Sequence, residues 1–509
     1  MTQVSEGLTE FEVVCPATGE VVGTVPEHRP ADIAQRSERL RAAQPEWEEI
    51  GPRERAKWLH RWRDWLMDDA IRILGLVQQE TGKSWGDTNI ELLAATQTMN
   101  YFADHAEAFL ADRATKSWGI ANITKRLEVL YRPYPLVGVI LPWNYPIAMP
   151  FLDIPAALMA GAAVLSKPSE FTPLAWSAAV AGWREIGAPD VLDVVTGHGS
   201  TGAAVVDAVD MVMFTGSATT GRKIGAQAGA RLIPASLELG GKDPMIVLAD
   251  ADIDRAVAGA IWGGFFNAGQ TCVSVERVYV EEPVYEEFVS KLTAQVADLR
   301  QGMDGQSVTA DVGAMANAKQ LEIVKRHVED AVAKGAKVAA GGTTADEGLF
   351  YRPTVLLEVD HSMACMREET FGPTLPVMKV PDAAEAVRLA NDSEYGLSAS
   401  VWTRDAERGR AIARQLDAGG VNINNVMMNV FQFPVPMQGW GCSGVGSRHG
   451  GANGVLKYCR SKAVVSEKIS TKRELQWYPY TARKVRIQQG AAKLLGARDW
   501  RRKLGLRSS

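Results

Sequence analysis

The chain has 509 residues, of which 46% are hydrophobic and 23% charged, and its formal net charge is -5 at pH 7 with His neutral. These values are ordinary for a globular protein of two or three domains, and they argue against a disordered chain. The negative net charge also provides no general basic field for nucleic acid.

The sequence carries no signal for export, membrane insertion or metal binding. Residues 1–10 lack the basic start and apolar core of a signal peptide, and the longest apolar runs fall short of the roughly 20 residues that cross a bilayer. Five widely separated cysteines without a C-x-x-C pattern favour a reducing compartment, and the seven histidines show no metal-binding spacing. We therefore expect a cytoplasmic protein without a bound metal.

The N-terminal part of the chain has the pattern of a helical layer. Apolar residues recur at helical spacing over residues 36–43, 53–66, 71–80 and 90–110. After this layer, Leu127, Val129 and Tyr131 alternate with charged residues, which predicts a pair of strands within 123–135. Such a hairpin indicates either an oligomer contact or a plain sheet edge.

Short apolar segments then alternate with helical ones, which predicts βαβ units and mostly parallel sheets. The first series of predicted strands covers 137–141, 163–166, 191–196 and 210–214. The second series covers 245–248, 277–281, 337–340, 354–358 and 397–403. We place a domain boundary near 237–241, and a last strand at 457–465 would complete the sheet begun at 123. Sheets of this kind bind small molecules at the carboxyl ends of their strands.

The C-terminal tail, residues 476–509, is strongly basic, with nine Lys and Arg residues against Asp499. A helix with Ile487, Leu494 and Leu495 on one side would suit an anionic membrane surface. Three glycines weaken this interpretation. An arm packed on an acidic face of a neighbouring subunit accounts for the same charge.

Six short motifs carry the candidate chemistry. In chain order they are Pro142-Trp143-Asn144-Tyr145-Pro146, Lys167-Pro168-Ser169-Glu170, Phe214-Thr215-Gly216-Ser217-Ala218-Thr219-Thr220-Gly221, Glu238-Leu239-Gly240-Gly241-Lys242, Gly269-Gln270-Thr271-Cys272 and Glu369-Thr370-Phe371-Gly372-Pro373. Taken singly, a cysteine is usually buried and inert, an Asn between prolines is a turn residue, and a Glu at a strand end is a surface carboxylate. Together and in this order, the motifs resemble the NAD(P)-dependent aldehyde dehydrogenase superfamily over about residues 10–466.

The resemblance implies an α/β fold with a Rossmann-type cofactor domain, an α/β catalytic domain and a small β oligomerisation element. The implied parts are a cofactor-binding domain over 1–122 and 136–237, a catalytic domain over 238–454, oligomerisation strands over 123–135 and 455–467, and a basic C-terminal tail over 468–509. The assembly would be a homodimer or homotetramer.

The resemblance also implies a mechanism with three catalytic residues. Cys272, as thiolate, would attack the aldehyde carbonyl. The Asn144 side-chain amide and the Cys272 backbone N–H would hold the developing oxyanion. Hydride transfer to the nicotinamide would leave a thioester, which water activated by Glu238 would hydrolyse to the carboxylic acid.

For the cofactor, the resemblance places Lys167 and Glu170 at the adenine ribose and Glu369 and Phe371 at the nicotinamide ribose and ring. The other expected cofactor-binding residues are Trp143, Ser169, Gly216, Ser217 and Gly221. The last three belong to a G-x4-G turn that follows a strand and enters a helix, where backbone amides can receive a pyrophosphate. A carboxylate at position 170 would repel a 2′-phosphate, so we predict NAD rather than NADP.

The substrate prediction depends on positions where succinate-semialdehyde-type members carry arginine for the substrate carboxylate. This chain has Leu152 and Phe266 there, and its 425–433 segment is rich in apolar side chains. We therefore predict an uncharged aliphatic or aromatic aldehyde, although the methionines of that segment also suit ordinary core packing.

Three alternatives remain: a succinate-semialdehyde-type dehydrogenase, a CoA-acylating relative, and a non-catalytic cofactor-binding or membrane-associated scaffold. Glu238 argues against the CoA-acylating branch, which generally lacks the water-activating glutamate. The complete set of Asn144, Glu238 and Cys272 argues against the scaffold.

Overall fold

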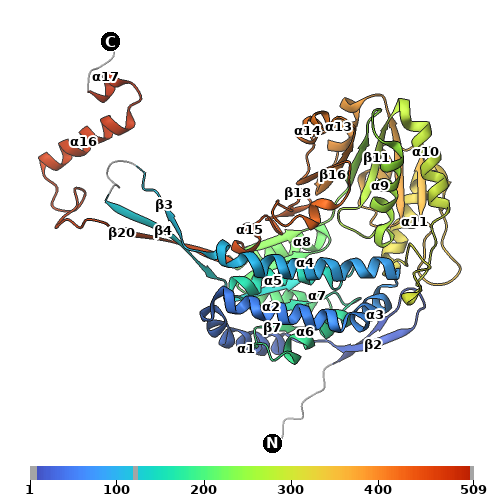
Figure 1. Ribbon diagram of the computed structural model, residues 1–509, viewed down its shortest axis with the longest axis horizontal. Helices are drawn as coiled ribbons and strands as arrows, with labels where there is room; N and C mark the ends of the chain where they lie inside the picture. The colour runs from blue at the N-terminus through green and yellow to red at the C-terminus, as the bar shows by residue number, and fades with distance from the viewer. Residues whose placement is uncertain (1–8, 119–123, 505–509) are drawn as a thin grey trace, which may run out of the picture. The chain divides into compact units, whose positions relative to one another are not determined.

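The computed structural model describes residues 9–118 and 124–504 (Figure 1). The chain divides into two units, of which the first comprises the residues up to Leu110 together with Pro133–Arg460. The second comprises Ala111–Arg132 and Ser461–Ser509. The first unit contains two large sheets, and the second contains one small sheet and the C-terminal helices.

Four strands of the six-stranded sheet in the first unit correspond to the predicted first series of βαβ units, and the strands at 235–238 and 444–445 were not predicted. The strand order of this sheet is β19 (Gly444–Val445), β9 (Ala235–Glu238), β8 (Met211–Thr215), β5 (Leu136–Ile140), β6 (Ala163–Lys167) and β7 (Leu192–Val194). The strands β5 to β9 are parallel, and β19 is antiparallel to β9. The strand order reverses between β5 and β8, and ligands bind parallel sheets at such a point.

Helices cover both faces of this sheet. The connecting helices are α5 (Ala148–Ala160), α6 (Leu174–Glu185), α7 (Gly199–Ala208) and α8 (Ala218–Ala230). The N-terminal helices are α1 (Pro30–Glu49), α2 (Gly51–Asp68), α3 (Ala70–Thr81) and α4 (Trp85–Leu110), as the periodicity predicted. Because α4 and α2 pack on α5, every residue of α5 is buried. An antiparallel pair, β1 (Glu10–Val14) and β2 (Val21–Pro26), precedes the helices and was not predicted.

The second sheet has seven strands. Their order is β12 (Lys337–Ala340), β13 (Thr354–Leu357), β14 (Thr374–Val380), β11 (Val275–Glu281), β10 (Asp243–Val247), β16 (Ser398–Trp402) and β17 (Gly420–Ile423). All neighbours are parallel except β12 and β13. Sequence analysis missed β14, which contains Pro376, and the short β17, because Pro and Gly weaken a strand pattern.

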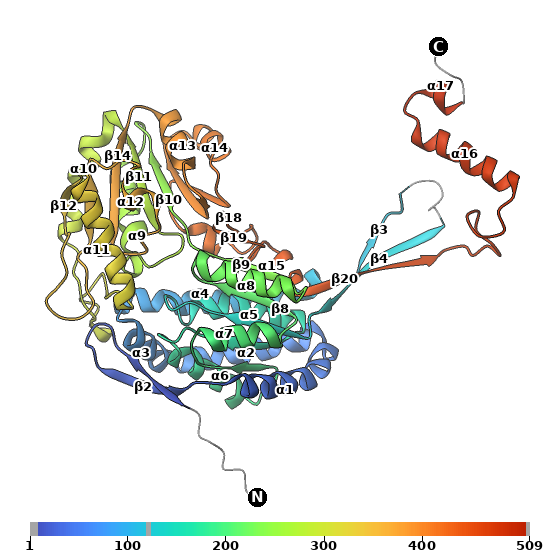
Figure 2. The ribbon, with the colours of Figure 1, turned by 180° about the vertical axis from the view of Figure 1, so that it is seen from behind.

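Helices also cover both faces of the second sheet (Figures 1 and 2). One face carries α9 (Ile253–Phe265) and α10 (Glu282–Ala297), and the other carries α13 (Ala383–Asn391) and α14 (Ala406–Ala413). Helix α11 (Ala318–Ala333) packs on the short helix at 364–367. Shorter elements are α12 (Ala364–Arg367), α15 (Asn453–Leu456), β15 (Tyr395–Gly396) and β18 (Trp440–Gly441). The chain passes from the first sheet to the second between Glu238 and Asp243, where the predicted domain boundary lies. The cofactor and catalytic roles of these domains stay predictions.

The small sheet of the second unit differs from the predicted one. A single strand, β4 (Lys125–Pro133), occupies the segment for which a pair of strands was predicted, and residue 123 lies outside the described residues. Its partners are β3 (Arg113–Thr115) and β20 (Cys459–Glu467). The prediction of two strands within 123–135 was therefore wrong. The prolines at 133 and 135, which lack an N–H, end β4 without supporting a hairpin there.

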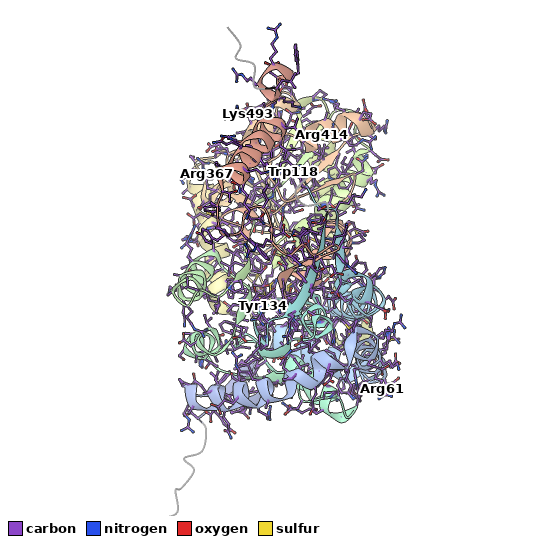
Figure 3. The ribbon with its side chains drawn as sticks, turned by 90° about the vertical axis from the view of Figure 1, so that its left-hand side faces the viewer. Arg61, Trp118, Tyr134, Arg367, Arg414 and Lys493 are labelled. Atoms are coloured by element: carbon purple, nitrogen blue, oxygen red, sulfur yellow. The ribbon has the colours of Figure 1, made fainter. Side chains whose placement is uncertain are left out.

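The C-terminal tail continues as two helices, α16 (Ala482–Gly496) and α17 (Trp500–Lys503). Lys493 lies on α16 (Figure 3). None of the helices in the described ranges combines the length and apolar composition needed to cross a membrane. An oligomerisation role for β4 and β20 stays a prediction.

Candidate active site

Cys272 follows a tight turn whose backbone has positive φ angles at three successive residues. The short helical turn Phe266–Gly269 ends α9, and Asn267, Ala268 and Gly269 have positive φ angles of 54°, 55° and 70°. A methyl group on residue 269 would lie 2.1 Å from the Gly372 carbonyl oxygen, so glycine is required there. This strained turn holds Cys272 partly exposed at the junction of two cavities.

Asn144 is fixed against the cysteine loop by hydrogen bonds at both its side chain and its backbone. Its Nδ2 donates to the Gln270 carbonyl oxygen at 2.8 Å, and its own carbonyl oxygen accepts from Asn267 Nδ2 at 3.0 Å. Because a side-chain amide carries two N–H donors, one donor remains for a ligand. The structure therefore brings together the predicted oxyanion donor and the predicted nucleophile.

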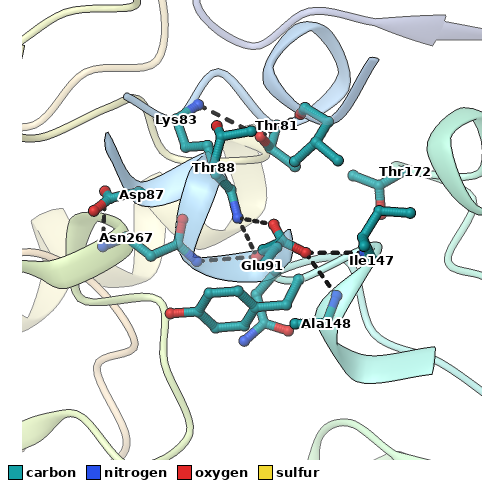
Figure 4. A network of polar contacts seen from close by, with 12 residues as sticks. Thr81, Lys83, Asp87, Thr88, Glu91, Ile147, Ala148, Thr172 and Asn267 are labelled. Carbon is teal, nitrogen blue, oxygen red and sulfur yellow. Dashed lines mark hydrogen bonds and ion pairs between the residues drawn. The ribbon is translucent and has the colours of Figure 1, made fainter. Parts of the chain in front are cut away.

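A buried ion pair between Lys83 and Glu91 lies against the Asn144 backbone (Figure 4). Lys83 Nζ lies 2.6 Å from Glu91 Oε1 and donates to the Asn144 carbonyl oxygen at 2.9 Å. Glu91 Oε2 accepts from the N–H groups of Ile147 and Ala148, both at 2.9 Å, at the start of α5. Sequence analysis missed this pair, because only the packing of α4 against α5 brings it to the site.

Glu238, the last residue of β9, is buried near the cysteine. Neither carboxylate oxygen has a hydrogen-bond partner among the described residues, so both are available to a water molecule or a ligand. Burial raises the pKa of Glu238 to about 7, the charges of Arg448 and Lys457 limit the rise, and Asp153 adds to it. A carboxyl group with such a pKa can act as a general base at neutral pH.

Three charged residues surround Glu238, of which Arg448 and Asp153 are fully buried. Arg448 Nε lies 3.3 Å and Lys457 Nζ 3.7 Å from Asp153 Oδ1. Arg448 also contacts the hydroxyl of Thr215. Sequence analysis missed all three. Asp153 was detectable, because it is the lone charged side chain in the otherwise apolar α5.

The protonation state of Cys272 differs from the expected thiolate. Burial raises the pKa of the Cys272 thiol to about 12, Arg448 opposes the rise, and Asp243, Glu238 and Glu369 add to it. The thiol form therefore predominates at neutral pH. A nearby base has to remove the proton during attack, since the thiolate is the nucleophilic form.

A polar cavity of about 760 Å³ lies on one side of Cys272. Besides Cys272, its lining includes six of the predicted site residues: Trp143, Asn144, Gly216, Ser217, Glu369 and Phe371. Ser217 caps α8 by accepting a hydrogen bond from the Thr220 N–H, and the Glu369 carboxylate accepts from the Gly241 N–H at 3.0 Å. The capped helix start and the partly buried Glu369 carboxyl group fit a dinucleotide, whose phosphates and ribose hydroxyls need such partners.

The remaining predicted cofactor residues are not among those that line this cavity. Lys167, Ser169 and Glu170 follow β6, and the Glu170 carboxylate lies 3.5 Å from Lys167 Nζ and 3.4 Å from Ser169 Oγ. Gly221 serves packing, because a methyl group there would lie 2.5 Å from a Leu239 methyl carbon. The cofactor roles of these residues stay predictions.

An apolar cavity of about 460 Å³ lies on the other side of Cys272. Its lining includes Leu152 and Phe266. The apolar 425–433 segment, which was predicted to line the substrate site, contributes Met427, Val430 and Phe431. Of that segment, Val426 and Met428 are not among the lining residues. The Phe266 ring stacks between Tyr145 and Trp262, with centroids 5.8 and 5.0 Å away.

The charges around the apolar cavity do not match a carboxylated ligand. Among the described residues that line it, none is Lys or Arg, and the carboxylate that does line it, Glu91, is already bound by Lys83, Ile147 and Ala148. A second carboxylate placed here would therefore meet no unpaired cation.

Known proteins share this sequence and fold. Residues 3–464 match the aldehyde dehydrogenase family. The chain is 40% identical over 480 residues to 4,4'-diapolycopene aldehyde oxidase of Methylomonas sp, which covers 93% of this chain and 89% of that protein. It is 41% identical over 457 residues to a Mycolicibacterium smegmatis protein provisionally named succinate-semialdehyde dehydrogenase [NADP(+)], covering 89% of this chain and 88% of that one.

The fold is similar to that of succinate-semialdehyde dehydrogenase from Burkholderia pseudomallei, with a TM-score of 0.86 and 35% identity over 90% of this chain and 95% of that one. The family match spans both large sheets, and the relatives cover nearly the whole chain. The chain therefore belongs to the aldehyde dehydrogenase family, whose members oxidise aldehydes to carboxylic acids with NAD or NADP.

Proposed function

We propose that this enzyme oxidises an uncharged, apolar aldehyde to its carboxylic acid with NAD, using Cys272 as the nucleophile. The observation that carries the proposal is the position of Cys272, which lines both the apolar cavity and the polar cavity. An aldehyde chain in the first cavity would present its carbonyl carbon to the sulfur. A dinucleotide in the second would reach the same atom from the other side.

The chain's own residues account for the first step. As the Cys272 sulfur attacks, its proton passes to Glu238, whose charge acts on the thiol and whose oxygens have no partner among the described residues. The free N–H of the Asn144 amide and the Cys272 backbone N–H hold the oxyanion, and one such donor contributes roughly 3–4 kcal/mol in a transition state. When bound, NAD supplies the acceptor for the hydride that leaves the former aldehyde carbon.

Glu238 releases the thiol proton to solvent and, ionised again, acts a second time. The thioester on Cys272 needs water as its nucleophile, and the Glu238 carboxylate accepts a proton from that water as it attacks. The carbon–sulfur bond breaks, the sulfur leaves as thiolate and is reprotonated, and the acid is released. The net reaction consumes one aldehyde, one NAD and one water, and it yields one acid, one NADH and one proton.

An apolar substrate is supported by the cavity lining and by a relative. Tyr145, Leu152, Phe266 and Met427 offer contacts to hydrocarbon and no unpaired charge. The Methylomonas relative is named for an aldehyde of diapolycopene. A succinate-semialdehyde substrate is the second candidate, because two similar proteins carry that name. It would need a cation that the described lining does not provide.

The choice of NAD rests on Glu170. Its carboxylate stands beside Lys167, and a 2′-phosphate at the adenine ribose would be repelled by it. Glu170→Gln is therefore expected to raise kcat/KM for NADP relative to NAD. Glu185→Gln, on the same domain, serves as the control. A wild-type enzyme that prefers NADP would overturn the assignment.

The substrate class is tested by kcat/KM for a panel of hexanal, decanal, benzaldehyde and succinate semialdehyde. We expect decanal and benzaldehyde to exceed succinate semialdehyde. Cys272→Ala is expected to abolish NADH formation with every aldehyde, whereas Cys442→Ala retains it. The highest value for succinate semialdehyde would reject the apolar proposal and leave the nucleophile assignment intact.

A further inference from the structure

The second unit of the chain concentrates basic charge. Residues 111–132 and 461–509 contain eighteen Lys and Arg against five Asp and Glu, although acidic residues outnumber basic ones in the whole chain. The match to the aldehyde dehydrogenase family ends at residue 464. The basic tail therefore lies beyond the part of the chain that matches the family.

Helix α16 (Ala482–Gly496) carries both basic residues and an exposed apolar side. The Thr481 hydroxyl caps it by accepting from the Lys484 N–H at 3.2 Å, and none of its residues is buried. Ile487, Leu494 and Leu495 lie on one side of the helix and are 47%, 52% and 50% exposed. Three half-exposed branched side chains on one side of a short helix indicate a surface that an apolar partner covers.

Two of the basic side chains of α16 are separated from this apolar side. Arg486 and Lys493 lie on another side of the helix, as the helical spacing of 100° per residue requires. Lys484 lies between the apolar residues, and its ammonium group donates to the Trp477 carbonyl oxygen at 2.8 Å. The helix therefore presents an apolar strip bordered by cations.

Aromatic side chains flank the helix at both ends. Trp477, Tyr478 and Tyr480 precede it and Trp500 follows it, and all four are exposed. The Arg501 guanidinium lies 5.5 Å from the centre of the Trp500 ring. Trp and Tyr favour the level of lipid headgroups, where one part of the ring meets hydrocarbon and the other meets water.

We propose that residues 476–504 bind the surface of an anionic lipid bilayer. The apolar side of α16 would enter the boundary between headgroups and acyl chains, and the basic side chains would meet the lipid phosphates. An acidic protein surface would satisfy the charges alone. It would leave the isoleucine, the leucines and the four aromatic rings without an apolar partner. The helix is too short to cross the bilayer, so the contact is peripheral.

The test uses full-length protein and co-sedimentation with vesicles of phosphatidylcholine, with and without phosphatidylglycerol. The charge variant combines Arg486→Gln, Lys493→Gln and Arg501→Gln, and the apolar variant combines Leu494→Ser and Leu495→Ser. Each basic residue near an anionic surface contributes about 1 kcal/mol, so the charge variant should bind about 100-fold more weakly. The control, Lys57→Gln with Lys337→Gln and Arg404→Gln, removes equal charge from the first unit.

We expect wild-type binding only with phosphatidylglycerol, weaker binding in high salt, and losses in both tail variants but not in the control. Aldehyde oxidation by all variants shows that they fold. The proposal is overturned if the wild type fails to sediment with the anionic vesicles, or if the tail variants bind as the control does. It is also overturned if the tail variants change only the oligomer size measured by ultracentrifugation without lipid.

Discussion

Arg448 and Asp153 form an ion pair with an Nε–Oδ1 distance of 3.3 Å, and both side chains are fully buried. Lys457 lies 3.7 Å from the same carboxylate oxygen. Arg448, Lys457, Asp153 and Glu238 together form a cluster of two cations and two carboxylates. The charge of Glu238 therefore depends on the other three residues as well as on its own burial.

Lys457→Met is expected to move the pH dependence of turnover to higher pH. Glu238 works as a base only when ionised, so activity falls as pH drops through its pKa, which is about 7. Removing one of the two cations that favour the ionised form raises this pKa, and the midpoint of the acid limb should move up by roughly one pH unit. The measurement is steady-state kcat from pH 5.5 to 9.

Two matched variants separate charge from packing. Lys457→Arg keeps a cation and should retain the wild-type midpoint, whereas Asp153→Asn removes an anion and should lower it. A purely structural role for the cluster would reduce kcat in all three variants without moving the midpoint. That result would contradict the electrostatic role of Lys457.

Glu238→Gln is expected to separate the two halves of the reaction. Without a base for water, the thioester accumulates, so a burst of about one NADH for each Cys272 should precede a steady-state rate lowered by roughly 10²- to 10⁴-fold. The burst itself should be slower than in the wild type, because the high pKa of Cys272 makes its proton hard to remove. Rapid-mixing absorbance at 340 nm measures both phases. An unchanged steady-state rate would remove Glu238 from the mechanism.

The sequence predicted the parts of the site that lie in local motifs at strand ends. Asn144 follows β5, which was predicted, so strand prediction placed it near the edge where ligands bind. Glu238 ends β9, which was not predicted as a strand, and only its sequence motif identified it. The pairs Lys83 with Glu91 and Arg448 with Asp153 are different. Their partners are charged residues in segments whose contact depends on how α4, α5 and the chain around α15 pack. Sequence spacing carries no information on such contacts.

The same limit explains the errors in the fold. The strand β3 has three residues, all exposed, and therefore lacks the alternation of buried and exposed positions that identifies a strand. Its pairing with β4 is a tertiary feature. The long buried helices and most inner parallel strands were predicted within a few residues, because burial imposes strong apolar patterns on them. The inner strands β9 and β14 are exceptions.

Phe266→Arg is expected to change the substrate preference. Phe266 lines the apolar cavity beside Cys272. The family resemblance implies an arginine at this position in some succinate-semialdehyde-type members. A charge-assisted bond to a substrate carboxylate contributes about 1.5–3 kcal/mol, so kcat/KM for succinate semialdehyde relative to decanal should rise by roughly 10- to 100-fold. Phe266→Met controls for the loss of ring stacking and should leave that ratio within a few-fold of the wild type. If Phe266→Arg and Phe266→Met had the same ratio of kcat/KM for succinate semialdehyde to kcat/KM for decanal, the substrate carboxylate would not bind in this cavity.

Lys83→Met is expected to lower both stability and turnover through the Asn144 loop. The substitution leaves Glu91 as a buried charge without its cation and removes a hydrogen bond from the Asn144 carbonyl oxygen. Breaking one partner of a buried pair costs about 3–5 kcal/mol, whereas replacing both partners by neutral groups costs much less. The melting temperature, compared at one scan rate, should therefore fall in Lys83→Met and largely recover in Lys83→Met with Glu91→Gln. Because the double variant still lacks the bond to Asn144, its kcat should remain low while its stability recovers. Recovery of kcat together with stability would show that Lys83 supports the fold and has no separate part in positioning Asn144.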